Sequence, residues 1–182
     1  AVTPRFAPTS SSSQLKQAAR LLNEYPSDDQ TKGVLLQTHL NENDEEIAWV
    51  NDLFPDSNSY FGVYEDHGIT GNRSVFGHCI HNTEEEYQRM AKTGSKVSLC
   101  PTSNLFLGSG LFELEKLESY GIDVSLASDV GGGDSFSMFK VMNEAYKICR
   151  LNDFNLDPIK AFYLTTLGAA KVLDMDDSIG NF

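Results

Sequence analysis

The sequence predicts an α/β fold in which parallel strands alternate with helices, as in (β/α) barrels. Short apolar runs recur along the chain, and each is followed by a segment whose apolar residues have helical spacing. Three of these runs end near a side chain that can bind a metal ion, namely His39, His78 and Asp129. The pattern gives about five strands, whereas a closed TIM barrel has eight. We therefore predict a partial TIM-like barrel with flanking helices, formed as a single domain by residues 1–182.

The strands are predicted from short apolar runs that end at glycine, proline or polar residues. The run at 34–40 has the composition of a strand buried on both faces, as in a parallel sheet. The predicted strands are residues 1–6, 34–40, 74–80, 96–100 and 122–128.

The helices are predicted from helical spacing combined with start and stop residues. Thr83 and Glu86 have the spacing of a capping box, and Gly94 ends the same helix. Asp157 followed by Pro158 suits a helix start. The predicted helices are residues 11–24, 43–54, 60–67, 83–94, 111–120 and 135–151, with a last helix from 157.

Composition and charge exclude several classes of function. The net charge of −12 disfavours binding to nucleic-acid phosphates or to an anionic membrane surface. No apolar run is long enough to span a bilayer, and the first residues lack the pattern of a signal peptide. Cys79, Cys100 and Cys149 have no CxxC spacing, so we expect reduced thiols in a cytoplasmic protein. Cys79 and Cys100 are expected to pack as small apolar side chains.

The candidate site residues lie at the C-terminal ends of separate strand-like runs. Glu42 lies three residues after His39, while His78 and Asp129 end later runs. Parallel strands direct their carboxyl ends to one face of the sheet, where active sites of such folds are built. Two imidazoles and a carboxylate suit a divalent metal ion, and a nearby glutamate can move protons from its bound water. A lone strand-end histidine is more often structural, and Asp129 could be a helix cap. The combination favours a metal-dependent hydrolase.

Other polar residues are open to two interpretations. Arg5 could donate to a substrate carbonyl while Phe6 stacks on a planar heterocycle, or the two could be a surface residue and a core residue. Residues 101–104 either face the same cleft or form a turn. His81 is expected to hydrogen-bond locally in a loop, and His67 to cap the end of a helix.

Several motifs resemble the guanine deaminase family of the amidohydrolase superfamily. The resemblance covers essentially the whole chain in order, and the Pro-Thr-Ser-Asn segment is highly specific. The motifs are Val2-Thr3-Pro4-Arg5-Phe6, Gln37-Thr38-His39 with Glu42-Asn43, Gly77-His78, residues 100–110, Ser128-Asp129-Val130-Gly131-Gly132, residues 161–168 and residues 179–182.

The resemblance implies a distorted TIM barrel with one metal ion, usually zinc, with iron as an alternative. The ion would activate water for the hydrolytic deamination of guanine to xanthine and ammonia. The implied partner is the small-molecule substrate guanine, without nucleic acid or membrane, and we expect a homodimer for the parent enzyme.

The resemblance also implies a role for each matched residue. His39 and Asp129 would bind the metal, and Asp129 would also accept the proton of the water. Glu42 would carry protons to the ring nitrogen and the leaving amine. His78 would orient the attacking hydroxide, with partial ligand character. The residues implied to hold guanine are Arg5 and Phe6.

The chain departs from the family pattern in what it lacks. The family's His-x-His pair, from its first barrel strand, has no counterpart, and the terminal β-strands that complete a small sandwich domain are also missing. We therefore expect residues 1–182 to be the C-terminal portion of an amidohydrolase barrel. This chain alone is expected to have little or no deaminase activity, whereas the full-length protein is expected to be active.

Two other functions stay open. A sibling amidohydrolase would deaminate or dechlorinate another nitrogen heterocycle, with contacts near Arg5 deciding the substrate. A non-catalytic fragment would bind metal or a partner without turnover. Cytidine-type deaminases need H-x-E with P-C-x-x-C, and neither motif occurs in this sequence.

Overall fold

The computed structural model describes residues 1–28 and 32–181, and this part of the chain is built around a parallel sheet. Its four strands lie in the order β1-β2-β3-β4, so strands that are neighbours in the sequence are also neighbours in the sheet. Parallel pairing requires a long crossover between strands, and helices supply it here. The strands are β1 (Leu36–Leu40), β2 (Ser74–His78), β3 (Lys96–Leu99) and β4 (Val124–Leu126).

The predicted strand at residues 1–6 is wrong as a full strand. It makes one isolated parallel bridge, between Val2 and Leu36, and then follows β1 more loosely. The backbone N–H of His39 still donates to the carbonyl of Arg5 at 3.1 Å. Pro4 lies between these contacts and has no N–H to donate, which explains why the ladder is interrupted.

The helices begin and end close to the predicted positions, with α5 as the main addition. Residues 101–104 were expected either to face the cleft or to form a turn. They begin a short helix, and from it the side chain of Asn104 reaches His78 in the cavity, so the first expectation holds for this residue. Pro101 is tolerated in the first turn of that helix, and Gly108 ends it with a left-handed φ of 74°. The helices are α1 (Ser12–Glu24), α2 (Asp44–Leu53), α3 (Tyr60–Asp66), α4 (Glu84–Thr93), α5 (Pro101–Leu107), α6 (Leu114–Ser119), α7 (Met138–Leu151), α8 (Pro158–Thr165) and α9 (Leu167–Val172), together with a 3₁₀ turn at Ala7–Thr9.

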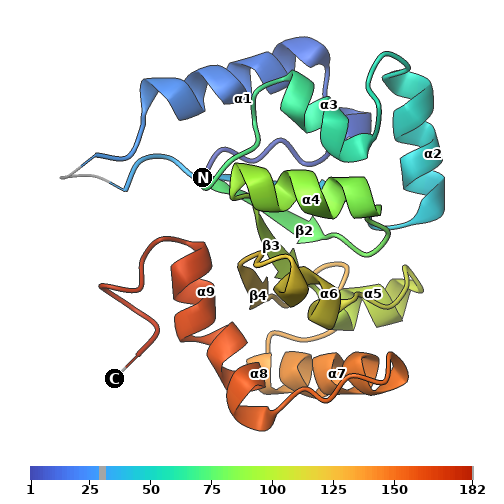
Figure 1. Cartoon of the computed structure of the whole chain (residues 1–182), viewed down its shortest axis with the longest axis vertical. Helices are drawn as coiled ribbons and strands as arrows, with labels where there is room; N and C mark the ends of the chain where they lie inside the picture. The colour runs from blue at the N-terminus through green and yellow to red at the C-terminus, as the bar shows by residue number, and fades with distance from the viewer. Residues whose placement is uncertain (29–31, 182) are drawn as a thin grey trace.

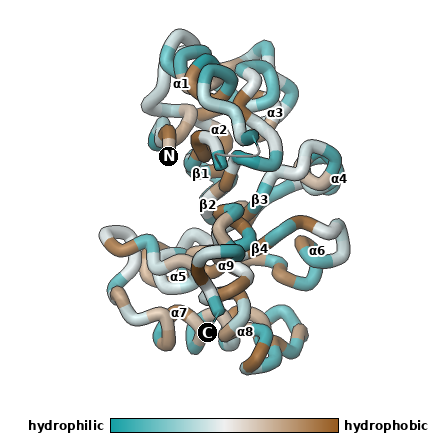
Figure 2. The backbone as a smooth tube through the Cα atoms, turned by 90° about the vertical axis from the view of Figure 1, so that its left-hand side faces the viewer, coloured by the Kyte–Doolittle hydropathy of each residue, from teal (hydrophilic) through white to brown (hydrophobic). Residues whose placement is uncertain are grey.

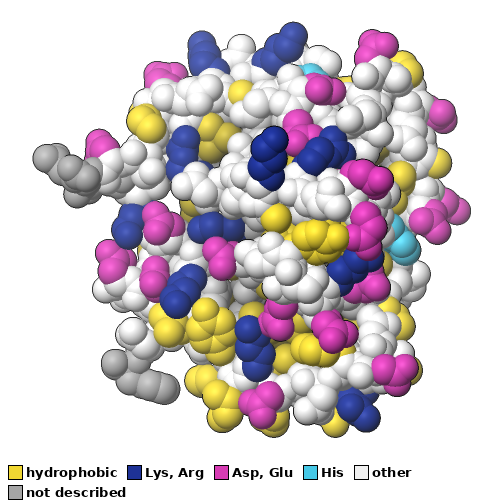
Figure 3. Space-filling view, viewed as in Figure 1, with side chains coloured by type: hydrophobic (Ala, Val, Ile, Leu, Met, Phe, Trp, Pro, Cys, Tyr) yellow, Lys and Arg dark blue, Asp and Glu magenta, His cyan; other side chains and the backbone are white. Residues whose placement is uncertain are grey.

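The sheet lies between two groups of helices. Figure 1 shows α1 to α4 at one end of the molecule and α5 to α9 at the other, and Figure 2 shows the same division from the side. Helices α8 and α9 pack against β4. On the face drawn in Figure 3, acidic side chains are spread among Lys and Arg. No helix within the described ranges is both long and apolar enough to cross a membrane.

The core holds the end of β1 in place. Tyr64 is fully buried, and its ring lies 5.6 Å from that of Phe76. Its hydroxyl donates to the backbone carbonyl of His39 at 2.8 Å and accepts from the backbone N–H of Ala7 at 3.1 Å. The aromatic core therefore fixes the backbone from which a candidate site residue projects.

A second buried connection starts from Glu86, which is 2% exposed. The predicted capping box is confirmed, because Glu86 accepts from the backbone N–H of Thr83 at 3.0 Å while Thr83 caps α4. The same carboxylate also accepts from the Phe61 backbone N–H at 3.1 Å and from the side-chain amide of Asn41 at 3.0 Å. Glu86 thus ties together α3, α4 and the segment after β1.

Candidate active site

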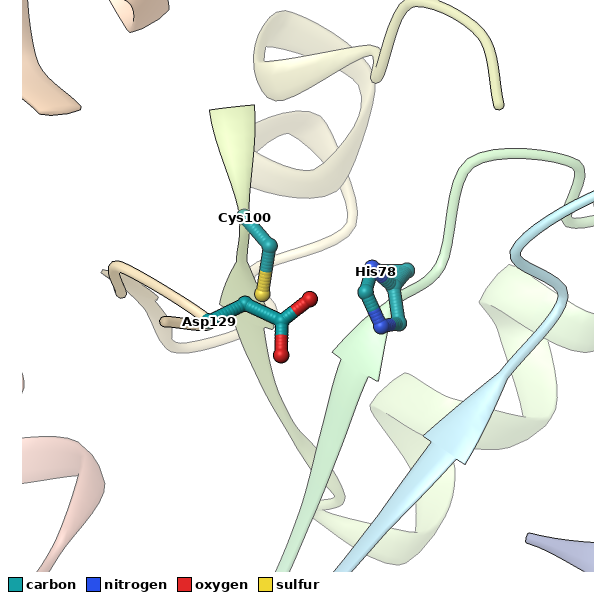
Figure 4. A group of neighbouring side chains, drawn as sticks. All are labelled: His78, Cys100 and Asp129. Atoms are coloured by element: carbon teal, nitrogen blue, oxygen red, sulfur yellow. The ribbon is translucent and has the colours of Figure 1, made fainter. Parts of the chain in front are cut away.

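The candidate site lies at the carboxyl ends of the strands. A cavity of about 350 Å³ is lined by His39 from β1, His78 from β2, Cys100 after β3 and Asp129 after β4. Figure 4 shows the carboxylate of Asp129 directed toward the ring of His78, with the thiol of Cys100 beside the Asp129 side chain. The parallel sheet therefore brings together side chains from distant parts of the sequence, as the strand-end argument predicts.

His39 is oriented by the N-terminal segment. Its Nδ1–H donates to the backbone carbonyl of Arg5 at 2.7 Å, because a carbonyl can only accept. The neutral ring then has an unprotonated Nε2, which is the form that binds metal ions. The rings of His39 and His78 are 5.0 Å apart between centroids.

His78 is 2% exposed and has polar partners on both sides of its ring. The side-chain amide of Asn104 donates to its Nδ1 at 3.1 Å, and its Nε2 lies 3.8 Å from a carboxylate oxygen of Glu42. Burial lowers the pKa of His78 below 6.5, since the charged ring loses hydration. The charges of Glu42 and Asp129 act in the opposite direction, whereas His39 adds to the lowering.

Glu42 is held at the edge of this group. The hydroxyl of Ser109 donates to its Oε1 at 3.0 Å, which leaves Oε2 on the side of His78. A side chain held in this way can accept or donate a proton within reach of the cavity, which is what general acid–base catalysis requires.

The backbone is in the left-handed region at two of these residues. His78 has a φ of 70° and Asp129 a φ of 43°, which is costly for residues other than glycine. The carbonyl of Asp129 accepts from the backbone N–H of Gly132 at 3.1 Å and that of Gly133 at 2.6 Å. A Cβ at Gly133 would lie 2.3 Å from the carbonyl oxygen of Ser128, so only glycine fits this tight turn.

Cys100 lines this cavity, although it was predicted to pack only as a small apolar thiol. It is buried as expected, but its Sγ lies beside His78 and Asp129. Burial is the main cause that raises the pKa of this thiol, and the charge of Asp129 adds to it. Its position at the C-terminal end of a predicted strand, the same position that singled out the histidines, was the signal that could have identified it. Cys79 is fully buried and lies in the apolar core, as expected.

Arg5 and Phe6 lie next to His39. The ring of Phe6 is 5.8 Å from that of His39, and the guanidinium of Arg5 lies 5.2 Å over the Phe6 ring. Arg5 is exposed and Phe6 is half-buried, so both can be reached from the solvent. Their role in holding a substrate stays a prediction.

The two remaining histidines behave as predicted. His81 lies in a loop and its Nε2 donates to the backbone carbonyl of Ser109 at 2.8 Å. His67 follows the last residue of α3, and its Nδ1 donates to the carbonyl of Val63 at 2.7 Å. Neither ring belongs to the group of donors around Asp129.

Glu46 is a buried carboxylate in the first turn of α2, four residues after Glu42, and it should make stability depend on pH. Burial raises its pKa from 4.5 to about 7; the charge of Glu42 also raises it, while the Tyr60 hydroxyl and Arg5 lower it. The folded state keeps the proton of Glu46 to a higher pH than the unfolded state does. The contribution of protonated Glu46 to the free energy of unfolding is therefore complete below about pH 4.5 and is lost as pH rises through about 7.

We expect the unfolding free energy of the wild type, relative to Glu46→Gln, to fall by about 3 kcal/mol across this window. Urea unfolding at several pH values measures it, with the exposed neighbour replaced in Glu45→Gln as the control. Parallel pH curves for the wild type and Glu46→Gln would contradict the expectation.

The donor set fits a divalent metal ion. One ligand atom each from His78, Cys100 and Asp129 lie within 4.8 Å of one another. Ligands about 2.0–2.3 Å from a single zinc ion lie at most about 4.6 Å apart, so small side-chain movements suffice. His39 is outside this closest group but lines the same cavity with Nε2 unprotonated.

The chain belongs to the amidohydrolase family, which matches residues 1–182. Guanine deaminase of Escherichia coli (strain K12) is 49% identical over 182 residues, covering 100% of this chain and 40% of the relative. A solved structure of E. coli guanine deaminase has a TM-score of 0.92 at 48% identity, covering 98% of this chain and 40% of that one. The predicted membership in the amidohydrolase superfamily and the partial-barrel fold are confirmed.

Two further structures extend the comparison. Guanine deaminase from C. acetobutylicum, solved with bound guanine in the active site, has a TM-score of 0.88 at 33% identity, covering 98% of this chain and 42% of that one. An adenosine deaminase from Xanthomonas campestris with bound zinc shares the fold, with a TM-score of 0.86 at 21% identity over 98% of this chain and 40% of that one. The chain thus spans about 40% of the length of these relatives.

Proposed function

We propose that the protein containing these residues is a guanine deaminase, which hydrolyses guanine to xanthine and ammonia. The observation that carries the proposal is the meeting of His39, His78 and Asp129 around one cavity at the strand ends, with Glu42 3.8 Å from His78. The 49% identity to E. coli guanine deaminase and the guanine bound to the C. acetobutylicum enzyme support the choice of substrate.

We propose zinc as the metal, with iron as the alternative. His39, His78 and Asp129 would hold it, with Cys100 as a further donor within reach. A divalent ion at this position would lower the pKa of bound water toward neutrality and so supply hydroxide. The unpaired cysteines suit a reducing compartment, so we also propose a cytoplasmic enzyme, and a homodimer stays a prediction.

The side chains around the cavity have complementary tasks in this proposal. Asp129 accepts the proton of the attacking water, and Glu42 delivers protons to the ring nitrogen and to the leaving amine. The reaction balances because one water adds across the carbon–nitrogen bond and one ammonia leaves. Arg5 donates to the guanine carbonyl while Phe6 packs on its ring.

The test is turnover of guanine by the full-length protein, with adenine and a chlorinated triazine as competing substrates. Guanine should be preferred, and Arg5→Ala should lower kcat/KM for guanine by about 10- to 100-fold through the loss of a charge-assisted hydrogen bond. The matched control is Arg20→Ala, which removes an exposed arginine that lies on α1, away from Arg5. Preference for another heterocycle, with guanine turnover unaffected by Arg5→Ala, would favour the sibling amidohydrolase.

A further inference from the structure

Residues 100–110 contact two residues of the candidate site, His78 and Glu42. Asn104 on α5 reaches His78, and Ser109 in the following loop reaches Glu42. Neither of these two polar residues has a part in the chemistry described so far. Both contacts cross between elements that are distant in the sequence.

Asn104 is held rigidly and is completely buried. Its backbone N–H donates to the carbonyl of Cys100 at 2.9 Å, and its own carbonyl accepts from the N–H of Ser109 at 2.9 Å. Its side-chain amide donates to Nδ1 of His78, while its Oδ1 has no partner within the described structure. The opposite orientation of the amide would instead leave an NH₂ group with two unpaired donors at that position.

This hydrogen bond determines which ring nitrogen carries the proton. A nitrogen that accepts from an amide cannot carry a proton itself, so the neutral ring of His78 is protonated at Nε2. That N–H points to the side of Glu42, whose Oε2 is 3.8 Å away. The arrangement is the reverse of His39, whose proton is on Nδ1.

Ser109 holds the carboxylate of Glu42. Its hydroxyl donates to Oε1 of Glu42, and its backbone carbonyl accepts from His81. Gly110 follows with a φ of 137°, and a Cβ there would lie 2.9 Å from the side chain of Ile80, so this turn requires glycine. The hydrogen bond from Ser109 leaves Oε2 of Glu42 free for proton transfer.

We propose that Asn104 and Ser109 are positioning residues for the proposed deamination. Asn104 keeps the proton of neutral His78 on Nε2, so that His78 donates a hydrogen bond toward the cavity. The metal proposed above would then be held by His39 and Asp129, with Cys100 within reach, and not by His78. Ser109 keeps the carboxylate of Glu42 turned toward the same space. The inference rests on the proposed function for its catalytic meaning, but the tautomer of His78 can be measured without turnover.

The first experiment is ¹⁵N NMR of the metal-free, histidine-labelled full-length protein at about pH 8, above the ordinary pKa of histidine. Comparison with the His78→Gln variant identifies the signals of His78. The wild type should show a protonated Nε2. Asn104→Asp, whose carboxylate can only accept, should move the proton to Nδ1, whereas Asn143→Asp on the exposed face of α7 should not. A proton on Nδ1 in the wild type overturns the proposal.

The second experiment is steady-state turnover of guanine by the full-length protein. Asn104→Asp and Ser109→Ala should each lower kcat by about 10- to 100-fold with KM little changed, as is typical when an orienting partner is lost. Ser109→Thr, which keeps the hydroxyl, should recover most of the loss. Normal kcat in both variants would refute the positioning role, whereas an inactive wild type with the expected tautomer would refute only the proposed substrate.

Discussion

Asp129→Asn in the full-length protein is expected to lower guanine turnover by about 1,000-fold. The substitution keeps the shape of the side chain but removes the negative charge and the ability to take a proton from water, and general-base contributions of about 10²- to 10⁴-fold are usual. The left-handed backbone at this position should be preserved, since asparagine adopts it as readily as aspartate. Steady-state kinetics measure the loss of turnover, and the metal content of the purified protein shows whether the loss of charge weakens metal binding.

The control is Asp123→Asn, which makes the same chemical change at an exposed position just before β4. It should retain full activity and metal content. If Asp129→Asn also kept its activity, the carboxylate would not be the proton acceptor, and the role proposed for this residue would have to be withdrawn.

Glu86→Ala is expected to lower the free energy of unfolding by about 4 kcal/mol. The carboxylate is buried and accepts from three donors, the backbone N–H groups of Thr83 and Phe61 and the side chain of Asn41. Removing it leaves buried donors without full pairing, at about 1–3 kcal/mol each, and it also removes half of the capping box. Equilibrium unfolding in urea measures the loss.

Glu85→Ala is the matched control, because Glu85 is exposed and lies in the same first turn of α4. It should change stability by less than about 1 kcal/mol. Equal losses for the two variants would show that the helix terminus alone matters and that the buried contacts of Glu86 contribute little.

The part of the site that lies directly at strand ends could be predicted from the sequence. His39, His78 and Asp129 follow apolar runs, and parallel topology alone requires the ends of such strands to share one face. Cys100 satisfies the same rule but was assigned to packing, because a buried thiol is ordinarily apolar in behaviour. The composition of the run does not reveal which neighbours the thiol will have.

Contacts made through loops and short helices could not be predicted in this way. The helix at Pro101–Leu107 is too short for a periodic pattern, and its sequence also suits a turn. The hydrogen bond from Asn104 to His78 joins β2 to α5 and depends on how those elements pack. A full strand was predicted at residues 1–6, and its interruption was missed because the apolar residues of this segment were given more weight than its single proline.

At His78 and Asp129, the left-handed backbone lowers stability, whereas the proposed function requires the side chains at these positions. Each position loses about 1–3 kcal/mol relative to a residue that accepts this conformation freely. Glycine would relieve that penalty and make the protein more resistant to heat, but it would delete the imidazole or the carboxylate. Descendants chosen only for thermostability would therefore drift toward glycine at these two positions and stop working as enzymes.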